Sequence, residues 1–257
     1  MRDCIERNSG DGIASPQIHI SGLQRVFRDN DCERTGMNKK LIIFGAEDNA
    51  QLAAFYFTHD SDYEVVALTV DQAYVDSDSK FDLPLVPFET IDDKFSPDEY
   101  DMFVAIGYTQ LNKLRREKYE AAKAKGYSIA TYLSSKATVW PGFVPGENCF
   151  ILEDNTIQPF ATVGDNVTLW SGNHIGHHSR IASHCFLTSH VVVSGGVKIG
   201  EHCFIGVNST IRDRVTIGAE CVIGAGSLIT ADVEDKGVYA PPSTERSRVP
   251  SNRLRKI

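Results

Sequence analysis

Histidines gather in one short stretch of this 257-residue chain. An imidazole titrates near neutral pH, so it can act as a general base. Several imidazoles that converge can instead bind zinc. The elements that position these rings decide which chemistry applies. Six of the eight histidines belong to the stretch: His174, His177, His178, His184, His190 and His202.

An aliphatic residue recurs at every sixth position through this region, with one proline as the exception. A helix repeats near 3.6 residues and a strand at 2, so neither produces the spacing. A chain that turns a corner every six residues does, and three hexapeptides close one triangular coil. Parallel pairing between coils satisfies the backbone while the aliphatic side chains fill the prism. The series is Val139, Pro145, Ile151, Ile157, Val163, Leu169, Ile175, Ile181, Leu187, Val193, Ile199, Ile205, Ile211, Ile217, Ile223 and Ile229.

Small residues also recur eighteen positions apart, which predicts that equivalent residues stack on successive coils. Four of the six cysteines belong to this series, so we expect small core residues rather than disulfides. Cys4 and Cys32 lie elsewhere, in a polar leader. The series is Cys149, Val167, Cys185, Cys203 and Cys221. Glycine follows the aliphatic at positions 146, 164, 176, 200, 206, 218 and 224, where a tight corner favours a missing Cβ.

No histidine of the stretch occupies an inward position of the hexapeptide. We therefore expect five of the rings at or beside corners, on an outer surface where subunits can meet: His177, His178, His184, His190 and His202. His184 and His202 are eighteen residues apart, so they are predicted to stack on one edge.

The first half of the chain alternates strand and helix patterns, which is typical of a doubly wound α/β domain. Strands are predicted at 41–45, 64–70, 83–88, 102–107 and 128–133, and helices at 49–58 and 109–125. Thr109 is the expected cap of the second helix. Four segments result: a disordered polar leader at 1–36, the α/β domain at 37–133, the coiled domain at 134–232, and a segment at 233–257 that covers the open end.

Bulk properties exclude several classes of protein. The net charge of −8 argues against a nucleic-acid partner. No hydrophobic stretch approaches membrane length, and the N-terminus lacks a signal-peptide core. We expect a cytoplasmic, reduced protein without a membrane partner.

Several motifs carry a resemblance to a known family: IIFGA at 42–46, VAIG at 104–107, YLSSKATVWP at 132–141, GHHSRI at 176–181 and GGVKIGEHCFIGVNSTI at 195–211. In this order they resemble the bacterial sugar acyltransferases of the hexapeptide-repeat superfamily. Members include UDP-4-amino-sugar N-acetyltransferases of the bacillosamine pathway, GDP-perosamine N-acetyltransferase and sialic-acid O-acetyltransferases. The resemblance implies a Rossmann-like α/β domain followed by a left-handed parallel β-helix, and the hand is taken from it.

The same resemblance implies a homotrimer that binds acetyl-CoA between neighbouring β-helices. A nucleotide-linked sugar reaches that groove from the α/β domain, and no metal is expected. Acetyl transfer to the amino group of a 4-amino sugar, in surface-polysaccharide or glycan precursor synthesis, is the expected activity.

The general base of the family falls on His177 in this chain. The family flanks its histidine with acidic residues, whereas the flanks here are Gly176 and His178. In the family, the residue whose carboxylate orients the imidazole occupies the position that His178 has in this chain. Another carboxylate does that work, or His178 hydrogen-bonds in its place, or the site is altered. His178 is the second candidate base, and a purely structural role at a subunit interface is the alternative for both rings.

The contacts to CoA fall on Phe186, Gly195, Val207 and Ala225 by the same resemblance. Phe186 stands where the bacillosamine-pathway N-acetyltransferase has a histidine. Gly195 and Ala225 give the pantetheine arm access to the coil backbone, and small residues required at corners are the alternative interpretation.

Candidate substrate contacts lie at two turns that follow predicted strands. Gly45 and Ala46 begin a turn whose N–H groups can bind phosphate, although Glu47 and Asp48 repel a diphosphate unless they point away. The second turn holds Gly107 and Tyr108, and Tyr108 can stack on a base or rest on the sheet edge. Asp71 ends the second strand and is a candidate for a ribose or base hydroxyl, or simply a solvent-exposed residue.

Three other functions stay open. Sugar O-acetylation uses the same chemistry with a hydroxyl nucleophile. A zinc-dependent hydratase similar to the γ-type carbonic anhydrases uses the same prism, with three histidines shared between subunits. A non-catalytic sugar-nucleotide binder is the third, favoured by Asp48 and by the absence of an acidic partner beside His177.

Overall fold

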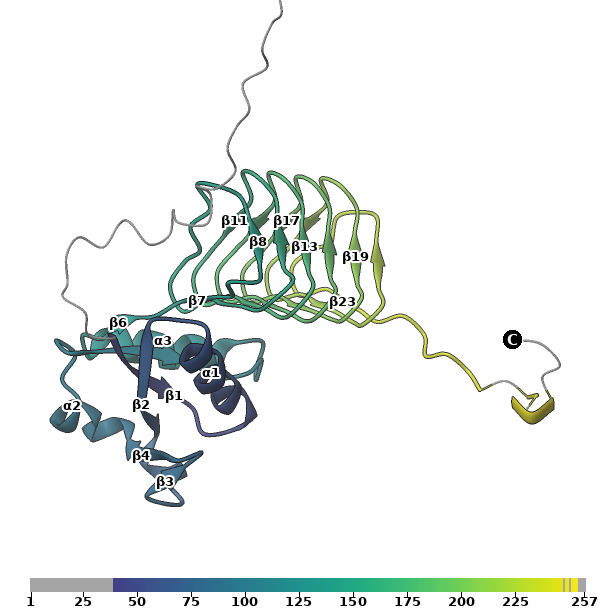
Figure 1. The fold of residues 1–257 in the computed structure, drawn as a ribbon. Helices are drawn as coiled ribbons and strands as arrows, with labels where there is room; N and C mark the ends of the chain where they lie inside the picture. The colour runs from purple at the N-terminus through teal and green to yellow at the C-terminus, as the bar shows by residue number, and fades with distance from the viewer. Residues whose placement is uncertain (1–38, 247, 250, 254–257) are drawn as a thin grey trace, which may run out of the picture. The chain divides into compact units, whose positions relative to one another are not determined.

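The computed structural model describes residues 39–246, 248–249 and 251–253. The predicted leader at 1–36, with Cys4 and Cys32, lies outside this range. The described chain begins with an α/β sheet and continues into a left-handed β-helix (Figure 1). The fold class expected from the sequence is confirmed.

Six strands form the first sheet, in the order β3-β4-β2-β1-β5-β6, and all neighbours are parallel except β3 and β4. The central strand β1 begins with two exposed lysines and continues as a buried apolar run from Leu41 to Phe44, which is typical of a parallel strand covered on both faces. The strands are β1 (Lys39–Phe44), β2 (Tyr63–Val70), β3 (Ser79–Lys80), β4 (Leu83–Pro87), β5 (Tyr100–Val104) and β6 (Ser128–Ile129).

Helices α1 (Asp48–His59) and α3 (Lys113–Ala124) cover opposite faces of this sheet. The alanines and Phe57 of α1 pack with Leu41 and Ile43. Tyr119 and Ala122 of α3 pack with alternate residues of β1, which point to the other face. Short helical turns are η2 (Gln72–Tyr74), η3 (Phe88–Thr90), α2 (Ile91–Lys94) and η4 (Ser251–Arg253). None of the described helices combines the length and apolar character that a membrane span requires.

Two predicted elements differ from the structure. Helix α3 begins at Lys113 rather than Thr109, because Gln110, Leu111 and Asn112 have left-handed φ angles of 53°, 53° and 64°. Asn112 rather than Thr109 is therefore the N-cap residue, and its side chain makes no capping hydrogen bond. The predicted strand at 128–133 is split, because β6 pairs with β5 whereas Tyr132–Leu133 (β7) pairs with β9 in the β-helix.

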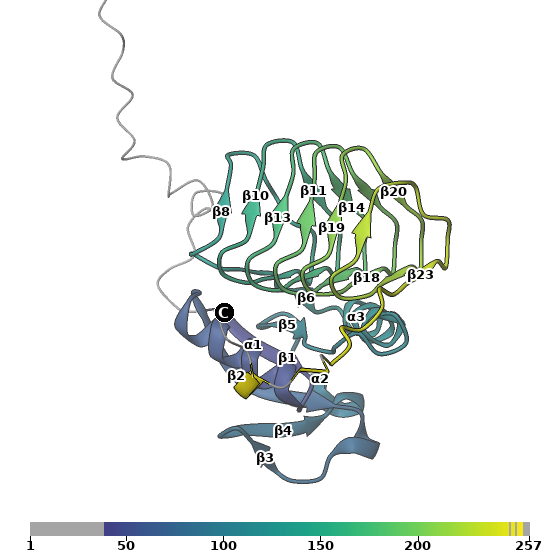
Figure 2. The ribbon, with the colours of Figure 1, turned by 90° about the vertical axis from the view of Figure 1, so that its right-hand side faces the viewer.

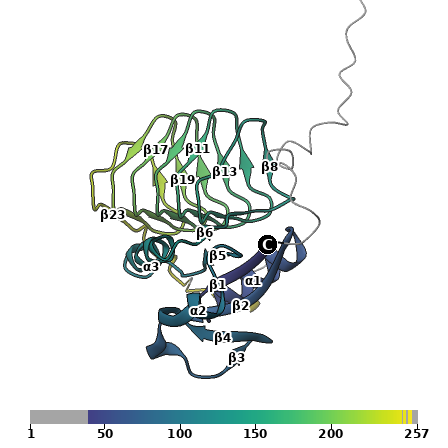
Figure 3. The ribbon, with the colours of Figure 1, turned by 90° about the vertical axis from the view of Figure 1, so that its left-hand side faces the viewer.

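The β-helix has three faces built from two-residue strands, and equivalent residues stack from coil to coil (Figures 2 and 3). The first face contains β8 (Thr138–Val139), β10 (Thr156–Ile157), β13 (His174–Ile175), β16 (Val192–Val193), β19 (Thr210–Ile211) and β22 (Leu228–Ile229). The second contains β11 (Thr162–Val163), β14 (Arg180–Ile181), β17 (Lys198–Ile199) and β20 (Thr216–Ile217). The third contains β7, β9 (Phe150–Ile151), β12 (Thr168–Leu169), β15 (Phe186–Leu187), β18 (Phe204–Ile205), β21 (Val222–Ile223) and β23 (Val238–Tyr239).

The interior of the prism matches the predicted six-residue series. Its aliphatic residues from Ile151 to Ile229 are at most 5% exposed, and the four stacked cysteines are fully buried with free thiols. Pro145 is the exception in structure as well, because no described strand forms at its position on the second face. Proline has no N–H to donate to a neighbouring coil.

The backbone conformation at the corners explains why histidine occurs at four of the six positions in the 174–202 stretch. A left-handed residue recurs every six positions, and where it is not glycine it is often Asn, Asp or His, the types enriched in this conformation. His178, His184, His190 and His202 all occupy this corner position, with φ between 58° and 63°. Their residue type is thus partly a backbone requirement, which His177 does not share.

The predicted glycines are required at the corners because a Cβ has no room there, as expected. At Gly176, for example, φ is not left-handed, but an added Cβ meets Ser194 of the next coil at 2.6 Å. Glycine is therefore required by close stacking of the coils.

Strand pairing continues beyond residue 232, where we expected the β-helix to end. Val233 pairs with Ile217, and β23 pairs with β21. The offset drops from eighteen to sixteen residues, as in Ile223 and Tyr239. The shortened last coil breaks the six-residue period without ending the stack.

Candidate functional site

The β-helix presents three edges that carry the candidate residues. The histidine edge, between the first and second faces, holds the corners 158–161, 176–179, 194–197 and 212–215. The helix edge, between the second and third faces, holds 164–167, 182–185, 200–203 and 218–221, and contacts α3. The open edge, between the third and first faces, holds 170–173, 188–191, 206–209 and 224–227.

His177 and His178 are exposed at the histidine edge. Their Nδ1 atoms lie 3.1 Å apart, and the two rings are nearly perpendicular. The backbone N–H of His177 donates to Gln158 Oε1 at 2.9 Å. Phe160, eighteen residues before His178, places its ring 4.8 Å from the His178 ring. The pair is therefore held at a fixed, exposed corner, with the two Nδ1 atoms within hydrogen-bond distance of each other.

Gly195 is the residue directly beneath the His177 ring. A Cβ at position 195 stands 2.7 Å from both Cε1 and Nε2 of His177, which is shorter than any normal contact. The Gly195 N–H donates to Asp213 Oδ1 at 2.9 Å, so this backbone is fixed from the next coil. Glycine at position 195 therefore leaves the space that the His177 imidazole occupies.

We expect Gly195→Ala to lower kcat/KM for the acetyl transfer expected from the sequence about tenfold, because the methyl group displaces the His177 ring. The same substitution made together with His177→Asn is expected to add little to the effect of His177→Asn alone. Steady-state kinetics of the four proteins measure this coupling. Additive effects would show that Gly195 acts independently of His177.

Val207 and Ala225 lie on the open edge, one above the other on successive coils. Both are exposed, Val207 to 38%. The Gly226 N–H donates to the Val207 carbonyl at 2.7 Å, which fixes the two corners together. Within one chain these residues and His177 belong to different edges that flank the first face.

Phe186 is buried on the third face and only 3% exposed. Its ring stacks on Phe204, with centroids 6.0 Å apart, and lies 5.1 Å from the ring of Tyr108. The Arg115 guanidinium stands 5.5 Å from the same ring. These contacts give Phe186 a packing role between the β-helix and the α/β domain.

The two candidate phosphate turns meet at the carboxyl end of the sheet. Gly45 has φ +135°, and a Cβ there lies 3.1 Å from the Ala105 carbonyl oxygen. A Cβ at Gly107 lies 3.0 Å from Asn49 Nδ2. Ala46 is buried between these turns. The sheet therefore brings Gly45, Ala46 and Gly107 together, as the sequence predicts.

A small cavity lies beside these turns and extends to the third face of the β-helix. Trp170 contributes an indole Nε1 that is buried without a hydrogen-bond partner. The lining residues are Asn49, Phe103, Val104, Ala105, Ile106, Asn148, Phe150, Thr168, Trp170 and Phe186. Tyr108 rests against Phe186 and Phe204 rather than on the sheet edge, and remains 55% exposed.

Two carboxylates near the turns, those of Asp71 and Glu47, are paired with lysines. Asp71 forms an ion pair with Lys118 of α3 at 2.8 Å, so it is not a freely exposed carboxylate. Burial alone lowers the pKa of Lys118, but its hydrogen bonds to Asp71 and Glu117 outweigh burial and raise it. Glu47 extends into solvent and reaches Lys80 at 3.4 Å.

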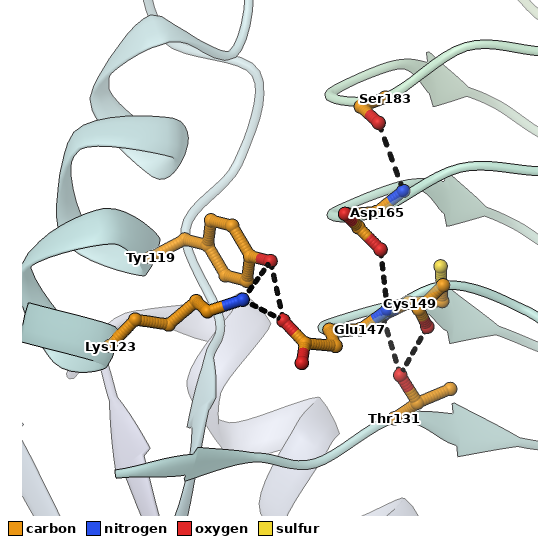
Figure 4. Close-up of polar contacts among 8 residues, drawn as sticks. Tyr119, Lys123, Thr131, Glu147, Cys149, Asp165 and Ser183 are labelled. Atoms are coloured by element: carbon orange, nitrogen blue, oxygen red, sulfur yellow. Dashed lines mark hydrogen bonds and ion pairs between the residues drawn. The ribbon is translucent and has the colours of Figure 1, made fainter. Parts of the chain in front are cut away.

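The helix edge is covered by α3, which the sequence did not predict. His184 and His202 stack at 4.9 Å, as expected, but they are 8% and 5% exposed rather than available to another subunit. Tyr119 Oη donates to Glu147 at 2.7 Å, and Lys123 of α3 binds the same carboxylate (Figure 4). Backbone N–H groups of Glu147 and Asp165 donate to side chains of the next coil, Asp165 Oδ1 and Ser183 Oγ, along this edge (Figure 4).

His184 is held in its neutral form. Its Nδ1 accepts from Asn166 Nδ2 at 3.0 Å, since the Asn166 oxygen is engaged by Arg115 and Asn148. Burial, followed by the charges of His202 and the neighbouring arginines, lowers its pKa to about 4. The unfolded chain protonates this side chain near pH 6.5.

We therefore expect the free energy of unfolding to fall as the pH drops from about 6.5 to about 4, because the unfolded state binds a proton that the native state excludes. The contribution of His184 amounts to roughly 3 kcal/mol at most. Urea unfolding between pH 4.5 and 7.5 measures it. His184→Asn removes this slope, whereas the exposed control His59→Asn retains it.

Arg115, which no sequence motif indicated, is fully buried beside the helix edge. Its guanidinium donates to Asn166 Oδ1, the Asn166 carbonyl and the Cys185 carbonyl at 3.0–3.1 Å. Burial lowers its pKa to about 10, so it remains charged at neutral pH. Asn148 and Asn166, eighteen residues apart, complete the network through Val104 of the sheet. The spacing of eighteen residues between Asn148 and Asn166 is the sequence feature that could have indicated this buried network.

Within the described part of a single chain, no three His, Cys, Asp or Glu side chains converge as metal ligands do.

Comparison with known proteins identifies the repeat and the fold. The family model described as bacterial transferase hexapeptide (six repeats) matches residues 196–231. No curated protein matches the chain in sequence. The acetyltransferase domain of PglB from Neisseria gonorrhoeae FA1090 matches in structure with a TM-score of 0.70 and 23% identity, over 78% of this chain and 96% of that one. The same domain has also been solved in complex with acetyl coenzyme A.

Two further structures show the same architecture. PerB from Caulobacter crescentus, in complex with CoA and GDP-perosamine, matches with a TM-score of 0.68 and 24% identity, over 77% of this chain and 92% of that one. WeeI from Acinetobacter baumannii AYE matches with a TM-score of 0.58 and 17% identity, over 77% and 94%. The chain therefore has the two-part fold of these proteins, an α/β sheet domain followed by a left-handed β-helix of hexapeptide repeats.

Proposed function

We propose that the chain transfers the acetyl group of acetyl-CoA to the amino group of a nucleotide-linked amino sugar, with a 4-amino sugar as the favoured acceptor. The observation that carries the proposal is the match of both domains to structures solved with acetyl-CoA, or with CoA and GDP-perosamine. Glycan precursor synthesis in the cytoplasm is the corresponding cellular role.

His177 is the general base in this proposal. As the sugar nitrogen bonds to the thioester carbonyl carbon, the C–S bond breaks and the nitrogen loses a proton. His177 Nε2, beside Gly195 on an exposed side chain, accepts that proton. The departing sulfur leaves as CoA thiolate, which takes up this proton from His177 and returns the imidazole to its neutral form. The exposed position of His177 and its lack of a corner-conformation requirement support this assignment over the other histidines.

The two turns at the carboxyl end of the sheet are the proposed contacts for the nucleotide. Gly45, Ala46 and Gly107 supply closely spaced backbone there, and the adjoining cavity holds the unpartnered Trp170 indole N–H. Tyr108 lies between these turns and the β-helix. Asp71 enters this site together with its Lys118 partner, which offsets its negative charge near a diphosphate.

A homotrimer is part of the proposal, because a shared site joins the two exposed edges. The first face lies between the histidine edge and the open edge, and its outward residues are uncharged or histidine: Thr138, Thr156, His174, Val192, Thr210 and Leu228. The second face instead presents Arg180 and Lys198. Depletion of charge favours the first face as an interface. Around a threefold axis, the histidine edge of one chain meets the open edge of the next.

In that arrangement Val207 and Ala225 of a neighbouring chain face His177, and their exposed small surface is the proposed contact for the pantetheine arm. Phe186 is not included, since its side chain is buried. A sedimentation experiment tests the assembly. A mass of three chains is expected, and a fully active monomer would contradict the shared site.

The activity is tested by incubating the protein with acetyl-CoA and UDP-, GDP- and dTDP-linked 4-amino sugars, with the matching hydroxy sugars as controls. Free thiol release and acetylated product are expected with an amino sugar. Release with the hydroxy sugars indicates O-acetylation instead. Binding without thiol release supports a non-catalytic binder, and stoichiometric zinc with carbon dioxide hydration supports the hydratase; either result contradicts the proposal.

A further inference from the structure

The partner of His177 at the histidine edge is a second imidazole. The Nδ1 atom of His177 lies 3.1 Å from Nδ1 of His178. Among the described residues, no carboxylate hydrogen-bonds to the His177 ring. Two nitrogens at this distance need one proton between them, so one ring donates and the other accepts. A base that acts through Nε2 must carry its proton on Nδ1.

We propose that His178 is the positioning residue that fixes this tautomer, by accepting the Nδ1–H of His177 on its own Nδ1. The inference rests on the proposed function for its catalytic meaning. His178 is suited to the task because its backbone is locked in the left-handed corner conformation, with φ 60°. Phe160 packs against its ring, which limits rotation.

A neutral imidazole differs from a carboxylate in this position. It orients the base but supplies no negative charge to favour the imidazolium, and two adjacent imidazoliums repel each other. The nearby charged side chains are Arg180 on β14, and Arg212, Asp213 and Arg214 on the corner 212–215, two coils further along the histidine edge. None of them hydrogen-bonds to either ring; the carboxylate of Asp213 accepts from Gly195.

Three substitutions of His178 separate orientation from charge. His178→Ala removes the acceptor, and we expect kcat to fall about tenfold while KM for acetyl-CoA stays within about twofold. His178→Asn keeps an acceptor oxygen and suits the left-handed conformation, so kcat stays within about threefold of the wild type. His178→Asp adds a charge, which moves the acidic limb of the kcat/KM profile upward by about one pH unit.

A measurement independent of activity is the tautomer of His177, observed by ¹⁵N NMR of the imidazole at neutral pH. The Nδ1–H form is expected in the wild type and in His178→Asn, and a mixture of forms in His178→Ala. An unchanged His177 tautomer in His178→Ala overturns the proposal, as does an unmoved acidic limb in His178→Asp. Absence of thiol release by the wild type overturns the proposed function alone, because the NMR result still decides whether His178 orients His177.

Discussion

Replacement of His177 by asparagine is expected to lower kcat/KM for acetyl transfer by about 10²- to 10⁴-fold, the usual contribution of a positioned general base. Asparagine has a similar size and keeps hydrogen-bonding capacity, but its amide cannot accept a proton near neutral pH. His177 lies exposed above Gly195 and outside the hydrophobic core, so the fold should persist. Thiol release from acetyl-CoA with the best acceptor measures the loss.

The control for this experiment is His59→Asn. His59 is exposed on α1, where its ring contacts the Phe55 carbonyl and stacks on the Phe55 ring at 4.1 Å. Its replacement is expected to leave turnover unchanged. If His177→Asn retains wild-type turnover, the base assignment is wrong and another group accepts the proton.

Replacement of Arg115 by methionine is expected to lower the free energy of unfolding by about 3 kcal/mol. Methionine retains much of the apolar stem but leaves the carbonyls of Asn166 and Cys185 without their charged donor. Loss of a hydrogen bond from a charged group costs about 1.5–3 kcal/mol, and recovery of the desolvation of the guanidinium offsets part of the sum. Denaturant unfolding at neutral pH measures the change.

Arg116→Met is the matched control, because the neighbouring arginine pairs with Glu120 at the surface. The two side chains of that pair are 46% and 56% exposed, so its loss costs about 0–1 kcal/mol. Equal stability changes in the two variants would contradict the role of Arg115 in joining α3 to the β-helix. A more stable Arg115→Met variant would show that burial of the charge outweighs its hydrogen bonds.

Local repetition explains why the β-helix is predictable from sequence. Each hexapeptide makes the same demand, an aliphatic residue at one position, so the signal is repeated along the series and survives a single exception at Pro145. The ends of single helices and strands are not marked by a repeated pattern of this kind. The start of α3 depended on three left-handed residues at 110–112, and the split of 128–133 depended on which sheet each half pairs with.

The candidate site was predictable only in part for the same reason. His177 and Gly195 are eighteen residues apart, so the periodicity alone places them on successive coils of one edge. The burial of Phe186 depends on Tyr108 and Arg115, which come from the other domain. The pairing of Asp71 with Lys118 likewise joins segments 47 residues apart.

By itself, the sequence determined the coil, its inward series and the edge to which each histidine belongs, because these properties follow from a short period that every coil repeats. The tertiary structure decided which edges are exposed. His184 and His202 share the corner conformation of His178, yet α3 covers them, and His202 contacts the Leu111 carbonyl 91 residues away. A contact of that range depends on how two separately folded surfaces meet, and no local pattern encodes it.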